Sequence, residues 1–221
     1  MNMNDISVII VTVKIKQILT NIQMGLQVPD DKADLSGCTG RKDNTMKTIY
    51  DTLSIRGRVT YAIMCFERYV TFKYPDKDMS AVAEMMWKII DDSDYIDNSA
   101  YRYMEIIPEY LFEANDFTSS EFDYMTKKEY VHFTALLPKP DDDKDLNTIM
   151  HLVYDIAMEY AYTAVELNAS ETKEYLQEIS RILKADHINL PEVGNIPEYE
   201  WDDTHGWGQP FDGRYPSIIL K

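Results

Sequence analysis

The distribution of glycine constrains the fold of this 221-residue chain more than any other feature. No glycine lies between Gly57 and Gly194. A β-rich or α/β domain of that length uses glycines for positive-φ turns and tight crossovers, whereas helices joined by short polar or proline-containing loops do not. The chain is therefore predicted to be mostly α-helical, as a single-domain helical bundle or a stack of helix pairs with an extended C-terminal tail.

Apolar residues at helical spacing support this prediction. One stripe of residues three or four apart lies between Ile55 and Val70, and a second lies between Met79 and Ile89. A third helix is predicted through Pro108, which kinks or restarts it.

Capping patterns predict where the later helices begin. The sequences TSSE (118–121) and TKKE (126–129) both match the capping box and place a helix start before the apolar stretch that follows. A long amphipathic helix is predicted over residues 146–167, and Ser170 is predicted to cap the next helix. The buried face of that last helix is expected to consist of Tyr175, Ile179 and Ile182.

The chain is predicted to divide near residue 45. Residues 1–45 are expected to form an N-terminal helix or strand, at 6–22, followed by a polar loop. Residues 46–221 are expected to form the helical domain, with the tail, residues 204–221, packed on it. The apolar run at the N-terminus is far shorter than the roughly 20 residues that span a bilayer, so neither a targeting segment nor a membrane span is predicted.

Cysteine usage suits a reducing compartment. Cys38 and Cys65 lie far apart and form no metal-ligand or redox spacing. Cys65 is expected to pack as a small hydrophobic residue, and Cys38 to lie in a polar loop. The predicted location is the cytoplasm.

Charge is the second unusual property of the chain. Aspartate and glutamate total 38 against 22 lysine and arginine residues, which gives a formal net charge of -16. Such a protein repels nucleic-acid phosphates and anionic membranes and attracts basic partners. High solubility alone is an alternative reason for the charge. We therefore expect a basic protein partner and no direct binding of nucleic acid or membrane, and the sequence leaves the oligomeric state open.

Carboxylates alternate with aromatic residues in three stretches, at 91–97, 109–124 and 199–203. Interfaces favour aromatic anchors, and acidic groups steer a basic partner and exclude wrong ones. The alternative is a solvated helix surface whose rings point inward. On the first interpretation, the partner-binding residues are Asp91, Asp92, Asp94, Tyr95, Glu109, Tyr110, Glu113, Asp116, Glu121, Asp123, Tyr124, Glu200, Trp201 and Asp202.

A histidine and two acidic residues offer an enzymatic alternative. Asp155 and Glu159 follow His151 at i+4 and i+8 on one predicted helix face. An imidazole and two carboxylates suit metal binding or acid–base chemistry. A single helix supplies too few ligands, so a solvated face is favoured. No catalytic residue, metal site or cofactor is predicted.

Two arginines flank a glycine at the start of the first predicted helix. Guanidinium groups at Arg56 and Arg58 suit a phosphate or carboxylate ligand. In so acidic a protein, pairing with neighbouring acidic side chains is favoured.

The tail, residues 204–221, holds three of the eight glycines. Gly206 and Gly208 allow the backbone to turn and to approach a helical surface closely, so that Trp207 and Phe211 can lie flat on it. A clasp over the core is favoured over a ligand site.

Two stretches, IRGRVTYAIMCFERYV at 55–70 and HGWGQPFDGRYPSIIL at 205–220, resemble helical immunity-type proteins of bacterial polymorphic and contact-dependent toxin systems. With the order of the helices, the resemblance extends over residues 49–220. It implies a cytoplasmic binding protein that neutralises a toxin domain by occluding it. It carries over no catalytic residue and no toxin-binding residue.

The leading hypothesis is an acidic, non-enzymatic immunity-type protein whose partner is a basic cognate toxin. A nuclease fits because carboxylates can stand where phosphates would bind. One alternative is an acidic decoy that blocks a nucleic-acid-binding protein. Another is a small metal-dependent hydrolase or transferase that uses His151 and Asp155.

Overall fold

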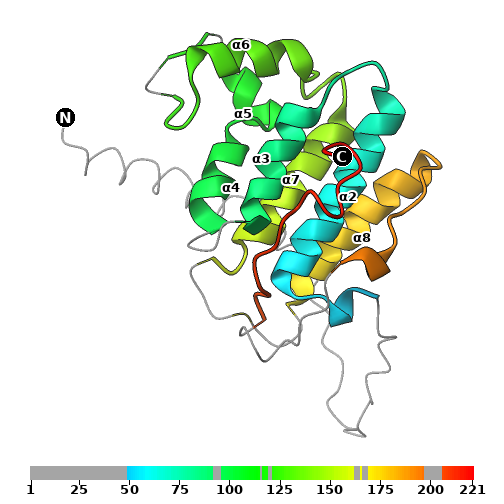
Figure 1. Cartoon of the computed structure of the whole chain (residues 1–221). Coiled ribbons are helices and arrows are strands. Elements are labelled where there is room, and N and C mark those ends of the chain that lie inside the picture. The colour runs from blue at the N-terminus through cyan, green and yellow to red at the C-terminus, as the bar shows by residue number, and fades with distance from the viewer. Residues whose placement is uncertain are drawn as a thin grey trace, which may run out of the picture. The chain divides into compact units, whose positions relative to one another are not determined.

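The described part of the chain is helical (Figure 1). The computed structural model describes residues 49–91, 96–114, 116–118, 121–161, 165, 169–196 and 206–221. Over these residues there are seven α-helices and no strand, so the prediction of a mostly α fold is confirmed. The helices are α2 (Ile55–Lys73), α3 (Ser80–Asp91), α4 (Ile96–Met104), α5 (Pro108–Glu113), α6 (Lys127–Leu136), α7 (Lys144–Met158) and α8 (Ser170–Ala185), with the short 3₁₀ helices η1 (Ile49–Thr52) and η2 (Val193–Asn195).

All of these residues belong to the unit Met46–Lys221. The expectations for residues 1–45, including the helix or strand at 6–22 and the loop around Cys38, concern residues outside the described ones. The predicted division of the chain stays a prediction.

α2 is the central helix of this unit, in contact with α3, α7 and α8. The expected stripe from Ile55 to Val70 is buried, but so is nearly every other residue of the helix, including Arg58 and Glu67. The sequence analysis predicted that one apolar face of α2 is buried, whereas the structure buries the helix on nearly all sides. A helix enclosed on several sides buries its polar side chains as well, and those side chains need hydrogen-bond partners inside the protein.

Most helix starts follow from the residues that cap them. Ser54 Oγ accepts the Gly57 amide at the start of α2, at 3.2 Å. Thr126 and Glu129 form the predicted capping box of α6, with each side chain accepting the other residue's amide. Pro108 is the first residue of α5, so it restarts a helix after a turn and does not kink a longer one.

Two predicted caps were wrong. The Thr118 hydroxyl donates to Glu121 at 2.7 Å, but no α-helix begins at that point of the described chain. Ser170 is the first residue of α8 and not its cap. The N-cap position belongs to Ala169, which has a φ of 37° and makes no side-chain capping bond.

α7 and α8 differ from expectation in length and in phase. α7 ends at Met158, well before the predicted end at 167, and a turn follows it. On α8, Ile179 and Ile182 are buried as predicted, but Tyr175 is only half-buried and Leu176 is fully buried.

The C-terminal segment, residues 206–221, runs across α2 and α3 without regular secondary structure (Figure 1, red). The carbonyls of Gly206 and Trp207 accept the amides of Ile55 and Arg56, each at 2.9 Å. The first amides of a helix have no partner within the helix. The segment therefore supplies acceptors for two of them at the start of α2.

Glycine is needed in this segment for two different reasons. Gly206 and Gly208 have φ values of 87° and 81°, in the left-handed region that favours glycine. At Gly213 the reason is space, because an added Cβ would lie 2.5 Å from Cε3 of Trp87.

Candidate functional site

The middle acidic stretch, residues 109–124, which we call the acidic segment, is described except at residues 115, 119 and 120. All of its predicted partner-binding residues are exposed: Glu109, Tyr110, Glu113, Asp116, Glu121, Asp123 and Tyr124. Asp91, at the end of α3, is also exposed. The remaining six lie outside the described residues, and their role stays a prediction: Asp92, Asp94, Tyr95, Glu200, Trp201 and Asp202.

A nearly buried glutamate fixes the backbone of the acidic segment. Glu105 is only 7% exposed, and its Oε1 accepts the amides of Asp123 at 2.6 Å and of Tyr124 at 3.0 Å. Burial raises the pKa of Glu105, and the backbone hydrogen bonds oppose that rise. The main chain at Asp123 and Tyr124 is thus fixed while both side chains stay exposed.

Three aromatic rings attach the same segment to α6. Phe117 and Phe122 stack with their centroids 5.7 Å apart and their planes at 4°. The ring of Tyr130, on α6, contacts both of them. The Tyr130 hydroxyl donates to the carbonyl of Ala114 at 3.1 Å. These contacts bury apolar area and pack Phe117 and Phe122 against α6.

The exposed side of the acidic segment combines charge with apolar area. It contains five carboxylates and no lysine or arginine. Tyr110 is 36% exposed and Tyr124 is 44% exposed, and Val131 on α6 is 58% exposed. Aromatic side chains in a field of one charge sign suit the capture of an oppositely charged protein surface.

His151 lies beside α5. Its Nε2 is 2.7 Å from Oε2 of Glu109, and its ring centroid is 5.3 Å from that of Tyr110. Burial raises the pKa of Asp155, and the nearby His151 opposes the rise. Glu159 is exposed and accepts a tyrosine hydroxyl from α8. Within the described ranges, no group of three or more His, Cys, Asp or Glu side chains is placed to hold a metal ion.

The two arginines of α2 point into the protein. Arg56 Nη1 donates to the carbonyl of Ile90, at the end of α3, at 2.8 Å. Arg58 Nη1 donates to the carbonyl of Ala169 at 2.7 Å and to Thr172 Oγ1 at 2.6 Å. Burial lowers the pKa of Arg58 to about 10. These guanidinium groups therefore join α2 to the ends of α3 and α8.

Glu67 is a second buried carboxylate, and the sequence analysis did not single it out. The residue is 0% exposed. Its Oε1 accepts the Trp87 indole N–H at 2.7 Å and the Ser217 hydroxyl at 2.5 Å, and its Oε2 accepts the Ile218 amide at 2.7 Å. One carboxylate thus joins α2, α3 and the C-terminal segment.

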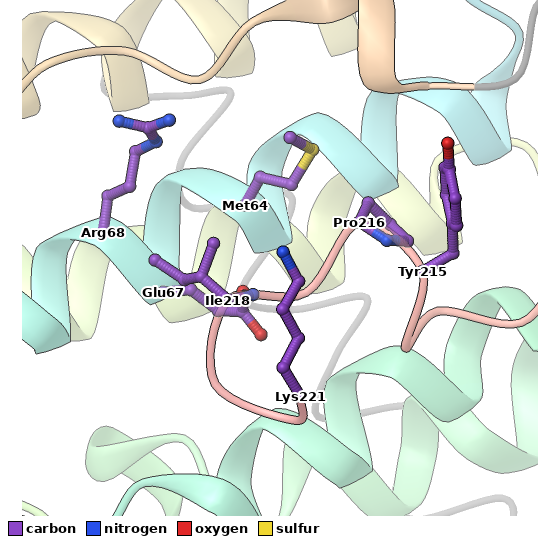
Figure 2. Close-up of a pocket in the computed structure, with 7 residues that line it drawn as sticks. All are labelled: Met64, Glu67, Arg68, Tyr215, Pro216, Ile218 and Lys221. Atoms are coloured by element: carbon purple, nitrogen blue, oxygen red, sulfur yellow. The ribbon is translucent and has the colours of Figure 1, made fainter.

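A pocket of about 260 Å³ lies beside Glu67, between α2 and the C-terminal segment (Figure 2). Two of its lining residues are strongly exposed, Tyr215 at 75% and Ile218 at 46%. In contrast to the acidic segment, the pocket is lined by the cations Arg68 and Lys221. Figure 2 shows Lys221 and Ile218 beside Glu67, with Tyr215 and Arg68 at opposite ends.

Sequence reasoning missed both buried glutamates. Glu67 follows Ile63 by four residues and so falls on the predicted apolar face of its helix, which was a usable signal. Glu105 stands between Met104 and Ile106 with no helical phase to place it inside, because α4 ends at Met104.

Comparison of the chain with known protein families, with curated proteins and with solved structures finds no match. In the part of the chain described here, no helix combines the length and the apolar character needed to cross a membrane. The acidic segment is therefore assigned as the candidate site from its own geometry and charge.

Proposed function

We propose that this chain is an acidic, non-enzymatic protein of the immunity type. It binds a basic toxin domain in the cytoplasm and neutralises that domain by covering its active surface. The resemblance of residues 49–220 to immunity-type proteins suggests the class, and the surface charge suggests the chemistry of the partner.

The observation that supports the proposal best is the ordered display of carboxylates and tyrosines on the acidic segment. Glu105 and the stacked rings of Phe117 and Phe122 fix this segment, while Tyr110 and Tyr124 remain exposed. The net charge of -16 adds long-range attraction for a basic domain. A nuclease fits because its phosphate-binding surface is basic and accepts carboxylates in place of phosphates.

Co-expression tests the proposal. The proposal predicts that a toxin domain is encoded beside this chain's gene. That neighbouring toxin domain is produced in a bacterial host with and without the chain. We expect growth to be restored by the chain and the two proteins to purify together, whereas an unrelated acidic protein of similar charge restores nothing. Equal killing with and without the chain contradicts the proposal.

The same acidic surface favours a second candidate, an acidic decoy that blocks a nucleic-acid-binding protein. Capture of such a protein, with no protection against the neighbouring toxin, selects the decoy. A third arm tests the hydrolase or transferase alternative, which uses His151 and Asp155. His151→Ala is expected to leave protection intact. Because His151 contacts Glu109 and Tyr110, only loss of protection with an unchanged circular dichroism spectrum and unchanged binding of the toxin domain selects the enzyme.

A further inference from the structure

We infer that the basic partner docks on the described residues of the acidic segment, 109–114, 116–118 and 121–124, and on the exposed Val131 in the first turns of α6. The pocket beside the C-terminal segment is not its docking site. The inference rests on the proposed function and adds the contact surface to it. Both surfaces expose apolar side chains, and charge distinguishes them.

The first surface keeps an excess of negative charge when its neighbours are counted. Residues 109–131 contain six acidic residues and two basic ones, Lys127 and Lys128. Arg102 of α4 also pairs with Glu129 at 2.8 Å, and six acidic against three basic residues leave a net charge of -3. The exposed apolar side chains within this range are Tyr110, Tyr124 and Val131. A basic protein is attracted to such a surface and finds anchors on it.

The second surface has the opposite character. Tyr215 and Ile218 are exposed beside Arg68 and Lys221. Glu67, the acidic residue of the pocket, already accepts three hydrogen bonds from the protein. A basic partner therefore meets cations at this surface and a carboxylate that is already engaged, and like charges placed together oppose docking.

The acidic segment is also organised before the partner arrives. Ordering a loop on binding costs free energy that would otherwise contribute to affinity. Here two backbone amides are bonded to Glu105, and Tyr130 contacts both stacked rings. Tyr124 is adjacent to the fixed Asp123 and is 44% exposed, so it is the side chain best placed to act as an anchor.

Binding kinetics of matched charge reversals test the inference, with the full chain and an inactive form of the neighbouring toxin domain as the probe. One variant carries Glu113→Lys, Glu121→Lys and Asp123→Lys. The control carries Glu84→Lys, Glu174→Lys and Glu192→Lys, which are exposed on other elements and change the net charge equally. We expect association to slow about tenfold or more in the first variant and less than about threefold in the control.

A second pair of variants tests the anchor. Tyr124→Ala is expected to speed dissociation about tenfold or more, whereas Tyr215→Ala, at the most exposed tyrosine of the other surface, leaves dissociation unchanged. Circular dichroism confirms that each variant is folded.

The outcomes separate the contact surface from the function. If the wild-type chain binds the toxin domain but the control triple or Tyr215→Ala has the larger effect, the surface is wrong and the function stands. If the wild-type chain binds no toxin domain, both are overturned.

Discussion

Two irregular segments of this protein, the C-terminal segment and the acidic segment, are each fixed by a buried glutamate. They differ in the role that the fixed segment has in the protein. Glu67 accepts an amide from Ile218, and Glu105 accepts amides from Asp123 and Tyr124. Glu67 lies on α2 and Glu105 directly follows α4. In both cases the carboxylate replaces the secondary-structure partner that an irregular backbone lacks.

The surroundings of the two carboxylates differ. Glu67 is fully buried and also accepts hydrogen bonds from Trp87 and Ser217, so it fixes the C-terminal segment on α2 and α3. Glu105 supports the backbone of Asp123 and Tyr124, whose side chains are both exposed. The comparison indicates that the C-terminal segment stabilises the fold, whereas the acidic segment presents exposed side chains. Each experiment below alters one of these two segments or the glutamate that fixes it.

The largest expected effect is on the C-terminal side. Glu67→Ala leaves three donors, from Trp87, Ser217 and Ile218, without their acceptor inside the protein. We expect the free energy of unfolding to fall by about 3–5 kcal/mol, because each buried donor loses its partner. Denaturant unfolding followed by circular dichroism measures the loss.

Two further variants sharpen this test. Glu67→Gln keeps a side chain of the same size and one acceptor oxygen, so its loss should be clearly smaller. Deletion of residues 204–221 should cost several kcal/mol, because partly buried apolar residues each lose a share of the roughly 1.5–3 kcal/mol that full burial contributes. These residues are Trp207, Phe211, Ile219 and Leu220. A truncated protein with the wild-type melting temperature would show that the segment does not stabilise the fold.

The next effect in size concerns packing of the same segment. In Gly213→Ala the added methyl group collides with the ring of Trp87. We expect a loss of about 1–3 kcal/mol, typical of an overfilled site. Gly194→Ala is the matched control, because its Cβ meets nothing within 4 Å and should change the melting temperature little. Equal melting temperatures for the two variants would contradict the close contact.

Local sequence signals predicted the parts of the fold that depend on neighbours along the chain. The capping box of Thr126 and Glu129 and the restart at Pro108 involve residues within one turn. The anchoring of the C-terminal segment depends on a bond between Glu67 and Ser217, which are 150 residues apart. No pattern along the chain encodes such a pairing, although glycine and aromatic content favoured close packing of this segment.

The candidate site shows the same limit. The alternation of carboxylates and rings predicted that Glu113, Asp123 and Tyr124 contact the partner, and all three are exposed. It did not predict how the segment is held. In the sequence nothing distinguishes Glu105 from the other acidic residues. Only the tertiary structure shows that it accepts hydrogen bonds from the amides of Asp123 and Tyr124.

An effect of similar size to that of Gly213→Ala is expected at Glu105. Glu105→Ala removes the acceptor of two amides and should lower the free energy of unfolding by about 1–3 kcal/mol. Glu105→Gln keeps an acceptor oxygen and should lower it by less than about 1 kcal/mol at pH 4. Unfolding experiments at several pH values distinguish the two variants.

The pH dependence has a definite sign. Burial raises the native pKa of Glu105 above the ordinary glutamate value of about 4.3. At pH values between the ordinary glutamate pKa and the raised native pKa, the native state binds more protons than the unfolded state. The contribution of Glu105 to the free energy of unfolding therefore falls as pH rises. Glu105→Gln removes that slope, and its stability relative to wild type should therefore increase from pH 4 to pH 7. A relative stability that decreases over this interval would contradict the buried, ionisable role of Glu105.

The central claim is that the acidic segment, and not the C-terminal segment, receives the partner. Amide hydrogen exchange of the free chain and of its complex with the neighbouring toxin domain reports on both regions in one experiment. The account predicts slower exchange in peptides from residues 109–131 on binding and unchanged exchange in peptides from 206–221. Slower exchange confined to 206–221, with none in 109–131, would contradict it.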